Sequence, residues 1–363
     1  MAKRISVDGW LFVITLLLVF VGLVMVFSAS AVVAQERHHS GYFFLLRQLG
    51  WAVAGFIAML AGMRFDYRRL EHPAVVFSLL GTTTLMLISV FFLDRSHHTH
   101  RWIHAGSFSI QPSELAKPVL ILFLAFFLES RTQSMGDARR TLLPAVLPTL
   151  VFIVLIVFQP DLGTAIACGA ITASILFVAG LELRYLAYGF LGSLIPLYFL
   201  IFHVAYRRDR ILAFLNPYSD PQGRGFHIIQ SLIAVSTGGL TGVGLMEGKE
   251  KLFYLPEPHT DFIFSVLGEE LGLVGCLAVV ALFAVFLWRG IRAALRTQEM
   301  FGRLLAVGIT SMVVVQAFIN ISVVLGLMPT KGIPLPLISY GGSSLFITLA
   351  CIGMLLNVTK QAE

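Results

Sequence analysis

The sequence predicts an all-α polytopic membrane protein with about ten transmembrane helices, and three observations lead to this fold class. Hydrophobic residues make up 57% of the 363 positions and charged residues only 13%, whereas an ordinary soluble domain carries about 25% charged residues. The mean hydropathy is +0.85. The apolar residues also gather in runs long enough to cross a bilayer, separated by polar segments. We therefore expect a single membrane domain over residues 1–363.

Ten apolar runs are the expected spans. The first, residues 10–27, follows Lys3 and Arg4 and is longer than the hydrophobic region of a typical cleaved signal peptide, so we expect it to be retained. The other nine lie at residues 44–63, 73–93, 114–129, 142–158, 162–181, 184–204, 262–288, 303–326 and 343–358. With ten crossings, both ends of the chain lie on the same side of the membrane.

The distribution of basic residues orients these spans. Loops on the side of the termini hold most of the Lys and Arg residues, among them Arg64, Arg68, Arg139, Arg140 and Arg289, and the short loops on the opposite side hold few. Enrichment in Lys and Arg is typical of cytoplasmic loops. We therefore expect both termini in the cytoplasm, and we attribute the net charge of +6 to membrane orientation and not to nucleic-acid binding.

One connection, residues 205–260, is far longer than the others and falls on the extracytoplasmic side. Connections of this length are usually functional or disordered. Part of it has a helical pattern with two faces: Phe226, Ile229 and Ile233 on one, and His227, Gln230 and Ser231 on the other. This pattern predicts an interfacial helix resting on the outer membrane surface. The glycines of residues 237–244 then predict a tight turn back towards the bundle, and their spacing does not match a dinucleotide-binding motif.

The segment before the eighth span holds the strongest candidate for catalysis. Pro256 and Pro258 lack amide donors and oppose helix formation, so they hold His259 and Asp261 on a short stiff segment. An apolar run begins directly after Asp261, and the first turn of a helix favours an anion. We predict that Asp261 stays charged at the membrane edge and acts in catalysis. A helix cap and a transport-coupling carboxylate are the alternatives.

Predicted spans also contain the acids Glu114, Glu269 and Glu270. An ionisable side chain at that depth costs about 2.5–3.5 kcal/mol when it faces lipid, so Glu269 and Glu270 should face the bundle or a cavity. Glu114 and Lys117 are one helical turn apart, which predicts a buried ion pair, with substrate binding as the alternative. Ser113 and Lys117 are four positions apart and not three, so they do not form the SxxK motif of acyl-serine enzymes.

The extracytoplasmic side also collects an irregular segment and many basic residues. Three prolines and three glycines prevent a continuous helix over residues 328–344, and irregular backbone at membrane depth requires protein or a wet cavity beside it. The basic residues on this side are Arg207, Arg208, Arg210, Arg224, Lys249, Lys251 and Lys331. Their charge suits a phosphate or pyrophosphate, which Arg binds with a fork of donors. Attraction to anionic lipid headgroups is the alternative.

Other polar and reactive residues have simpler interpretations. Asp161 precedes the predicted span 162–181 and is expected to cap that helix. Six histidines lack the spacing of a metal site and are expected to be solvated: His38, His39, His97, His98, His100 and His104. The three cysteines, Cys168, Cys276 and Cys351, lie inside apolar runs, which indicates packing and not redox chemistry.

Motifs along nearly the whole chain resemble those of the SEDS family of bacterial cell-wall polymerases. They are FSAS (27–30), RQLGW (47–51), RWI (101–103), QPSELAK (111–117), QPDLGTA (159–165), NPYSDPQGRGFHIIQS (216–231), KLFYLPEPHTDFIF (251–264), GEELG (268–272) and PTKGIPLPLISYGGSS (329–344). Chance does not produce so many motifs in one order. The motifs at 251–264 and 329–344 resemble the cell-division branch of the family more than the elongation branch.

The resemblance implies a peptidoglycan glycosyltransferase that polymerises lipid II, a disaccharide-pentapeptide carried on undecaprenyl pyrophosphate, at the outer face of the bacterial cytoplasmic membrane. In this sequence Asp261 matches the family's essential aspartate, and Trp102 matches a second functionally important position. The expected substrate-binding residues are Trp102, Arg101, Glu114, Lys117, Arg207, Arg210, Arg224, Lys251, His259, Lys331 and Ser343.

The resemblance also implies partners and a cellular location. The partners are a class B penicillin-binding transpeptidase and other membrane proteins of the division machinery, and the location is the division septum. A divalent cation, Mg²⁺ or Mn²⁺, is a candidate helper for the pyrophosphate leaving group. Three alternatives stay open: a lipid II flippase, a RodA-type elongation polymerase and a noncatalytic division scaffold. The concentration of polar motifs on the extracytoplasmic side favours chemistry there over transport.

Overall fold

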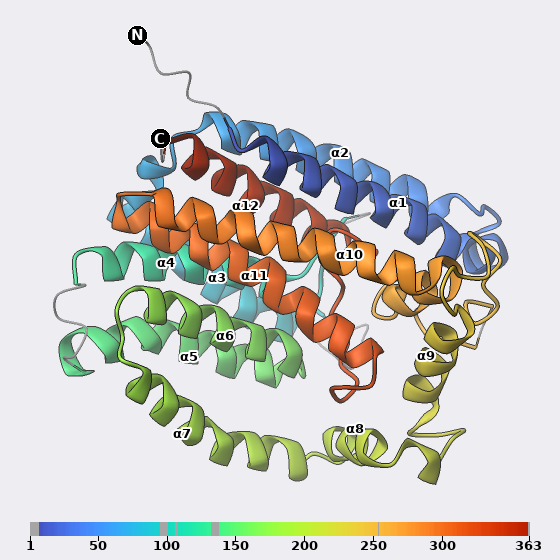
Figure 1. Cartoon of the computed structure of the whole chain (residues 1–363). Coiled ribbons are helices and arrows are strands. Elements are labelled where there is room, and N and C mark those ends of the chain that lie inside the picture. The colour runs from blue at the N-terminus through green and yellow to red at the C-terminus, as the bar shows by residue number, and fades with distance from the viewer. Residues whose placement is uncertain (1–6, 95–100, 106–107, 132–137, 253, 362–363) are drawn as a thin grey trace.

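The computed structural model describes residues 7–94, 101–105, 108–131, 138–252 and 254–361, and these form an almost entirely helical protein (Figure 1). The twelve α-helices are α1 (Gly9–His38), α2 (Phe43–Arg64), α3 (Pro73–Leu93), α4 (Pro112–Glu129), α5 (Leu143–Phe158), α6 (Leu162–Val178), α7 (Leu183–Phe202), α8 (Ala205–Leu215), α9 (Phe226–Thr237), α10 (Ile263–Arg296), α11 (Met300–Val324) and α12 (Gly342–Gln361). Short 3-10 or π turns lie at Tyr67–Glu71, Ala138–Leu142 and Pro217–Ser219. The predicted all-α class is confirmed.

Ten of these helices coincide with the ten predicted spans, and the protein is a multi-pass membrane protein. Within the described residues, eight helices are long and apolar enough to cross a membrane. The other two predicted spans are α4, which carries Glu114, Lys117 and Glu129, and α6, which has 17 residues. The first helix begins, and α12 ends, at the same end of the bundle (Figure 1). The opposite end carries α8 and α9, and we call it the loop end.

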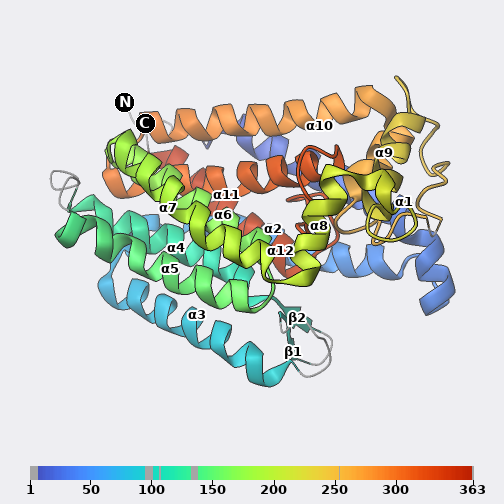
Figure 2. The same ribbon diagram turned by 90° about the horizontal axis from the view of Figure 1, so that it is seen from below.

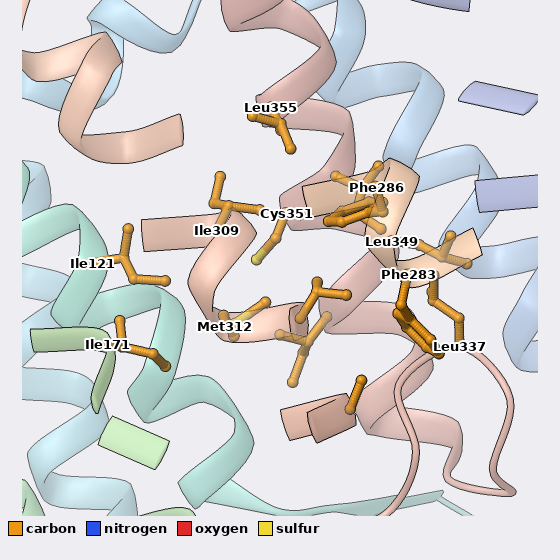
Figure 3. Packing of buried hydrophobic residues seen from close by; sticks show 14 of the residues in the cluster. Ile121, Ile171, Phe283, Phe286, Ile309, Met312, Leu337, Leu349, Cys351 and Leu355 are labelled. Atoms are coloured by element: carbon orange, nitrogen blue, oxygen red, sulfur yellow. The ribbon is translucent and has the colours of Figure 1, made fainter. Parts of the chain in front are cut away.

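The bundle is held together by close helix contacts around α11 and α12. Ile309 and Met312 of α11 lie near Cys351 of α12 in a buried apolar cluster (Figure 3). Small residues let α2 approach α12 closely: a Cβ added to Gly353 would lie 2.4 Å from the carbonyl oxygen of Met59. Membrane helices associate by such close packing, because burial from lipid gives no hydrophobic gain. All three cysteines are buried and free, as expected for packing residues.

The 205–260 connection contains a second helix, α8, which the sequence pattern did not indicate. The predicted helix, α9, is present with two faces. It buries Ile228, Ser231 and Ala234 against the protein, whereas Ile233 of the predicted apolar face is 39% exposed, as expected for a side chain turned towards the membrane interface. Ser231 faces the bundle because its hydroxyl lies 2.7 Å from the carbonyl oxygen of Val324, to which it donates a hydrogen bond.

The predicted glycine turn is confirmed, and it fills a break in α10. At Gly272 the backbone has φ 66° and ψ −163°, so α10 is interrupted there. The turn 238–244 supplies the missing hydrogen bonds: the carbonyl of Gly239 accepts from the amide of Leu273 at 2.9 Å, and the amide of Gly244 donates to the carbonyl of Glu270 at 3.1 Å. Only glycine fits at the break, because a Cβ on Gly272 would lie 2.3 Å from the backbone nitrogen of Gly242.

A short hairpin carries the RWI motif to the loop end. Strands β1 (Ile103–Ala105) and β2 (Phe108–Ile110) pair antiparallel, with Ile103 opposite Ile110. Figure 2 shows the hairpin between the end of α3 and the start of α12. Arg101 and Trp102 therefore lie at the same end as the 328–341 segment.

Candidate active site

Asp261 lies at the loop end, two residues before α10 begins. It does not cap this helix by hydrogen bonding: Phe262 is the N-cap residue, and it makes no side-chain capping bond. The carboxylate instead lies against the segment 328–341, because a Cβ added to Gly332 would be 2.8 Å from Asp261 Oδ2. The helix-cap alternative for Asp261 is therefore not supported.

Burial changes the acidity of Asp261. The pKa of its carboxyl is raised to about 7, chiefly by removal from water and to a smaller extent by the nearby carboxylate of Glu257, while the Arg210 and Arg101 guanidinium groups oppose the rise. Desolvation outweighs the two cations. With a pKa of about 7, the carboxyl of Asp261 is ionised in only part of the molecules at neutral pH, because proximity to a helix N-terminus does not offset the loss of solvent. A carboxylate with a pKa near the working pH is suited to general base catalysis.

Three cationic side chains from separate segments, Arg101, Arg210 and Lys331, lie near Asp261 or near one another. The positive charge of Arg210, in α8, lowers the pKa of both Asp261 and Lys331. The charge of Arg101 lowers the pKa of both Asp261 and Arg210. Arg210 Nη1 also donates to the carbonyl oxygen of Thr330 at 3.5 Å, which ties α8 to the segment that holds Lys331. Burial lowers the pKa of Lys331 to about 8, against the opposing effect of Asp161. The structure thus brings together Asp261, Arg101, Arg210 and Lys331 of the predicted site.

Hydrogen bonds fix both the main chain of Arg101 and Trp102 and the side chain of Arg101. The carboxylate of Asp94, itself buried, accepts hydrogen bonds from the backbone nitrogens of Arg101 at 3.0 Å and Trp102 at 3.3 Å. The guanidinium of Arg101 donates to the carbonyl oxygens of Gln159, at 3.0 Å, and Pro160. The RWI and QPDLG motifs are therefore joined directly, and Trp102 is half-buried beside them.

The predicted cap and ion pair are both present. Asp161 caps α6 by accepting from the amide of Thr164 at 3.1 Å. Lys117 Nζ lies 2.9 Å from Glu114 Oε1, with side chains only 3% and 4% exposed. Two further partners complete the pair: Gln316 Oε1 accepts from Lys117 at 2.6 Å, and Ser344 Oγ donates to Glu114 at 2.7 Å. This favours the structural interpretation of Glu114 and Lys117, and their contact with substrate stays a prediction.

Three predicted cationic ligands already have protein partners outside the Asp261 cluster. Arg207 donates to the carbonyl oxygens of Leu200 at 3.2 Å and Val157 at 3.0 Å, which joins α8 to α7 and α5. Arg224 pairs with Asp209 at 3.1 Å. Lys251 pairs with Glu270 at 2.5 Å in a buried contact that also includes Ser28. The pattern of positive charge could not reveal these partners, because they depend on how the helices and the 205–260 connection fold together.

The remaining predicted residues are buried close to the site. His259 lies between aromatic rings, 4.7 Å from the centroid of Phe44 and 5.6 Å from that of Tyr340. Ser343 is buried in the first turn of α12. Glu269 and Glu270 are buried in protein, as expected, and Glu269 accepts a hydrogen bond from the amide of Lys249 at 2.6 Å.

No group of three His, Cys, Asp or Glu side chains suited to a metal occurs among the residues that the structure describes. His38 instead stacks on Phe43, with ring centroids 3.8 Å apart. His97, His98 and His100 lie outside the described residues, as does the side chain of His104.

Sequence reasoning missed Asp94, Gln316 and Asn320. Gln316 Nε2 donates to the carbonyl oxygen of Pro334 at 3.0 Å, and Asn320 Nδ2 donates to that of Asp261 at 2.8 Å. A signal was present, because two amide side chains four positions apart in an apolar span lie on one helix face.

These features define a multi-pass helical membrane protein with a partly buried carboxylate and three cations at its loop end. Residues 9–363 match the cell cycle protein family of FtsW, RodA and SpoVE. The chain therefore belongs to the SEDS family.

Similar relatives and structures cover nearly all of the chain. The probable peptidoglycan glycosyltransferase FtsW of Geobacter metallireducens is 46% identical over 94% of this chain and 92% of its own length. Stage V sporulation protein E of Bacillus subtilis is 44% identical over 99% of both chains. A solved structure described as the coordination of polymerization and crosslinking by a peptidoglycan synthase complex is 34% identical, covers 98% of both chains and gives a TM-score of 0.81. The rod shape determining protein RodA of Thermus thermophilus is 29% identical with a TM-score of 0.71, covering 98% of this chain and 97% of its own.

Proposed function

We propose that this protein is a peptidoglycan glycosyltransferase that polymerises lipid II at the outer face of the cytoplasmic membrane during cell division, with Asp261 as the general base. One observation carries the assignment of the base: the pKa of Asp261 is raised to about 7 at a site that also holds Arg101, Arg210 and Lys331. The similarity to chains named peptidoglycan glycosyltransferase supports the activity. Synthesis of polymer from purified lipid II, described in the Discussion, tests it.

The residues fit the chemistry of this reaction. The 4-hydroxyl of one substrate's N-acetylglucosamine attacks the anomeric carbon of the growing chain's N-acetylmuramic acid. A glycosidic C–O bond forms with inversion, the bond to the lipid pyrophosphate breaks, and Asp261 takes the hydroxyl proton. Such proton transfer is worth about 10²–10⁴-fold in rate. Arg101, Arg210 and Lys331 stabilise the negative charge of the departing pyrophosphate.

The proposed glycosyl transfer has no step that we assign to a divalent cation. The carboxylates of Asp161 and Glu257 both act electrostatically on Asp261, but the three do not form a ligand cluster in the described part of the chain. The three cations named above already match the charge of a pyrophosphate.

The partner that we propose is a class B penicillin-binding transpeptidase, together with other division membrane proteins. The similar solved structure is described as a peptidoglycan synthase complex that couples polymerization and crosslinking, which supports a crosslinking partner for this chain. The transpeptidase would join the new strands that this protein makes.

A lipid II flippase is the second candidate. The observation that favours it is the break of α10 at Gly272, because discontinuous helices are typical of transporters. Against it, the cations around Asp261 come from segments at one end of the bundle, which suits chemistry at one membrane face.

The topology predicts labelling from opposite sides. We expect single cysteines at Ser219 and Arg139, in a background without the three native cysteines, to react with an impermeant reagent from outside and from inside the cell, respectively. The reason is the excess of Lys and Arg on the side of the termini. Labelling of both positions from one side would exclude the ten-span arrangement.

A division role predicts a location in the cell. We expect a fluorescent fusion to concentrate at midcell late in the cycle, because the motifs at 251–264 and 329–344 resemble the division branch. Movement around the side wall throughout growth would indicate an elongation role instead. Localisation confined to the spore septum would indicate a sporulation role like the one named for the Bacillus subtilis relative.

A further inference from the structure

The main chain that leads into Asp261 is held by hydrogen bonds to three consecutive carbonyl groups, those of residues 259, 260 and 261. The carbonyl oxygen of His259 accepts from the amide of Tyr340 at 2.9 Å, and that of Thr260 accepts from Ser339 Oγ at 2.5 Å. The carbonyl oxygen of Asp261 accepts from Asn320 Nδ2 at 2.8 Å. The first two donors belong to the segment 328–341, and the third belongs to α11.

Asn320 joins two segments at once. Its Nδ2 also donates to the carbonyl oxygen of Ile333 at 2.7 Å, two residues beyond Lys331. The side chain is only 1% exposed, and in the described structure its Oδ1 has no hydrogen-bond partner. The contribution of this amide therefore comes from its two N–H groups, which hold the segment of Asp261 against the segment of Lys331.

We propose that Asn320 is a positioning residue for the reaction: it fixes the main chain of Asp261 and the segment of Lys331 at the separation that the chemistry requires. This inference rests on the proposed function of Asp261. Asp261 must meet the acceptor hydroxyl while Lys331 meets the pyrophosphate, so a change in their relative position disturbs both contacts. Displacement of a reacting group by about 1 Å can cost about 10²-fold in rate.

Gln316 extends the same helix face. One turn before Asn320, its Nε2 holds the carbonyl oxygen of Pro334 and its Oε1 accepts from Lys117. The segment 328–341 is thereby fixed at two neighbouring carbonyls, those of Ile333 and Pro334. Of these two side chains, only Asn320 binds the main chain of Asp261. The experiment below therefore tests Asn320.

The chain offers a matched control in Asn357. This side chain is also buried, and its Nδ2 donates to the carbonyl oxygen of Met63 at 2.8 Å, but it lies near the end of α12, remote from the loop end. Asn357 Oδ1 also accepts from the amide of Tyr67 at 3.4 Å and from Gln361 Nε2 at 2.9 Å, so Asn357→Ala removes at least as much buried hydrogen bonding as Asn320→Ala, at the opposite end of the bundle. Asn320→Asp retains the shape of Asn320 and removes the amide donors.

The test is steady-state polymerisation of purified lipid II by the complex of each variant with its transpeptidase, alongside the thermal midpoint of each variant. We expect Asn320→Ala and Asn320→Asp to lower kcat by about 10²-fold with KM within about twofold of wild type, and Asn357→Ala to retain wild-type kcat at a similar thermal midpoint. If Asn320→Ala does not fold, Asn320→Asp decides.

Three outcomes separate the inference from the function on which it rests. Wild-type kcat in a folded Asn320 variant, with Asp261→Asn inactive, would overturn the positioning role and leave the base assignment intact. An equal loss of kcat in Asn357→Ala would also overturn it, because any buried amide would then have the same effect. An active Asp261→Asn variant would instead overturn the base assignment.

Discussion

Replacement of Asp261 by Asn is expected to abolish lipid II polymerisation and to leave a folded, membrane-inserted protein that still binds its transpeptidase. The carboxamide has the size of the carboxyl group and still forms hydrogen bonds, but it cannot accept the proton of the attacking hydroxyl. We expect a loss of about 10²–10⁴-fold in rate. Asp261→Ala should behave alike. Polymer yield from purified lipid II in detergent is the measurement, because detergent has no second leaflet and cannot report flipping.

The same substitution should not destabilise the fold. The folded-state pKa of Asp261, about 7, lies above its ordinary value of 3.8. The stability contribution of this group is therefore complete below about pH 3.8, and it is lost as the pH rises through 7. Asn carries no charge to bury, so at pH 8 the thermal midpoint of Asp261→Asn should equal or exceed that of wild type. Asp66→Asn, at the start of the Tyr67–Glu71 turn, is the control, and it should retain polymerisation.

The second large effect is expected at the buried ion pair. Glu114→Ala leaves Lys117 in the bundle with only the neutral Gln316 as a partner, and loss of one member of a buried pair costs about 3–5 kcal/mol. We expect low abundance in the membrane and a clearly lower thermal midpoint. Glu114→Gln combined with Lys117→Met removes both charges and should recover much of the stability.

An exposed ion pair provides the comparison for Glu114. Glu182 and Arg184 lie 2.8 Å apart with side chains 55% and 59% exposed. Water screens the attraction between such exposed charges, so we expect the loss of this pair to change stability little. Thermal midpoints of Glu114→Ala and Glu182→Ala in the same detergent test the difference. Equal midpoints would contradict the burial of Glu114 and Lys117.

Hydropathy located the ten spans, although α1 and α10 continue beyond the predicted apolar runs, to His38 and Arg296. The predicted span 73–93 has the bounds of α3. The tight turn at 238–244 was also predicted correctly, because its glycines indicate a turn in the sequence. The pairing of Glu114 with Lys117 and the cap at Asp161 followed from spacing within one helix.

The rest depends on contacts between distant segments. The break of α10 at Gly272 exists because residues 239–244 supply its hydrogen bonds. Helix α8 was missed because its 11 residues carry consecutive charges from Arg207 to Arg210 that hide its apolar positions. The raised pKa of Asp261 comes from tertiary burial. Asp94 and Asn320 bind main-chain groups of other segments, and although Gln316 and Asn320 share a helix face, the sequence does not show which carbonyl groups they bind.

The proposal that Asp261 is the base is tested most directly by the pH dependence of kcat/KM for lipid II polymerisation. Below pH 7 the carboxyl of Asp261 is protonated and cannot accept a proton, so kcat/KM should fall about tenfold per pH unit. Above about pH 8, Lys331 loses its charge and its hold on pyrophosphate, so kcat/KM should fall again. We predict a bell-shaped profile with its rising limb near pH 7. A profile that stays flat, or that falls as the pH rises through 7, would contradict the assignment.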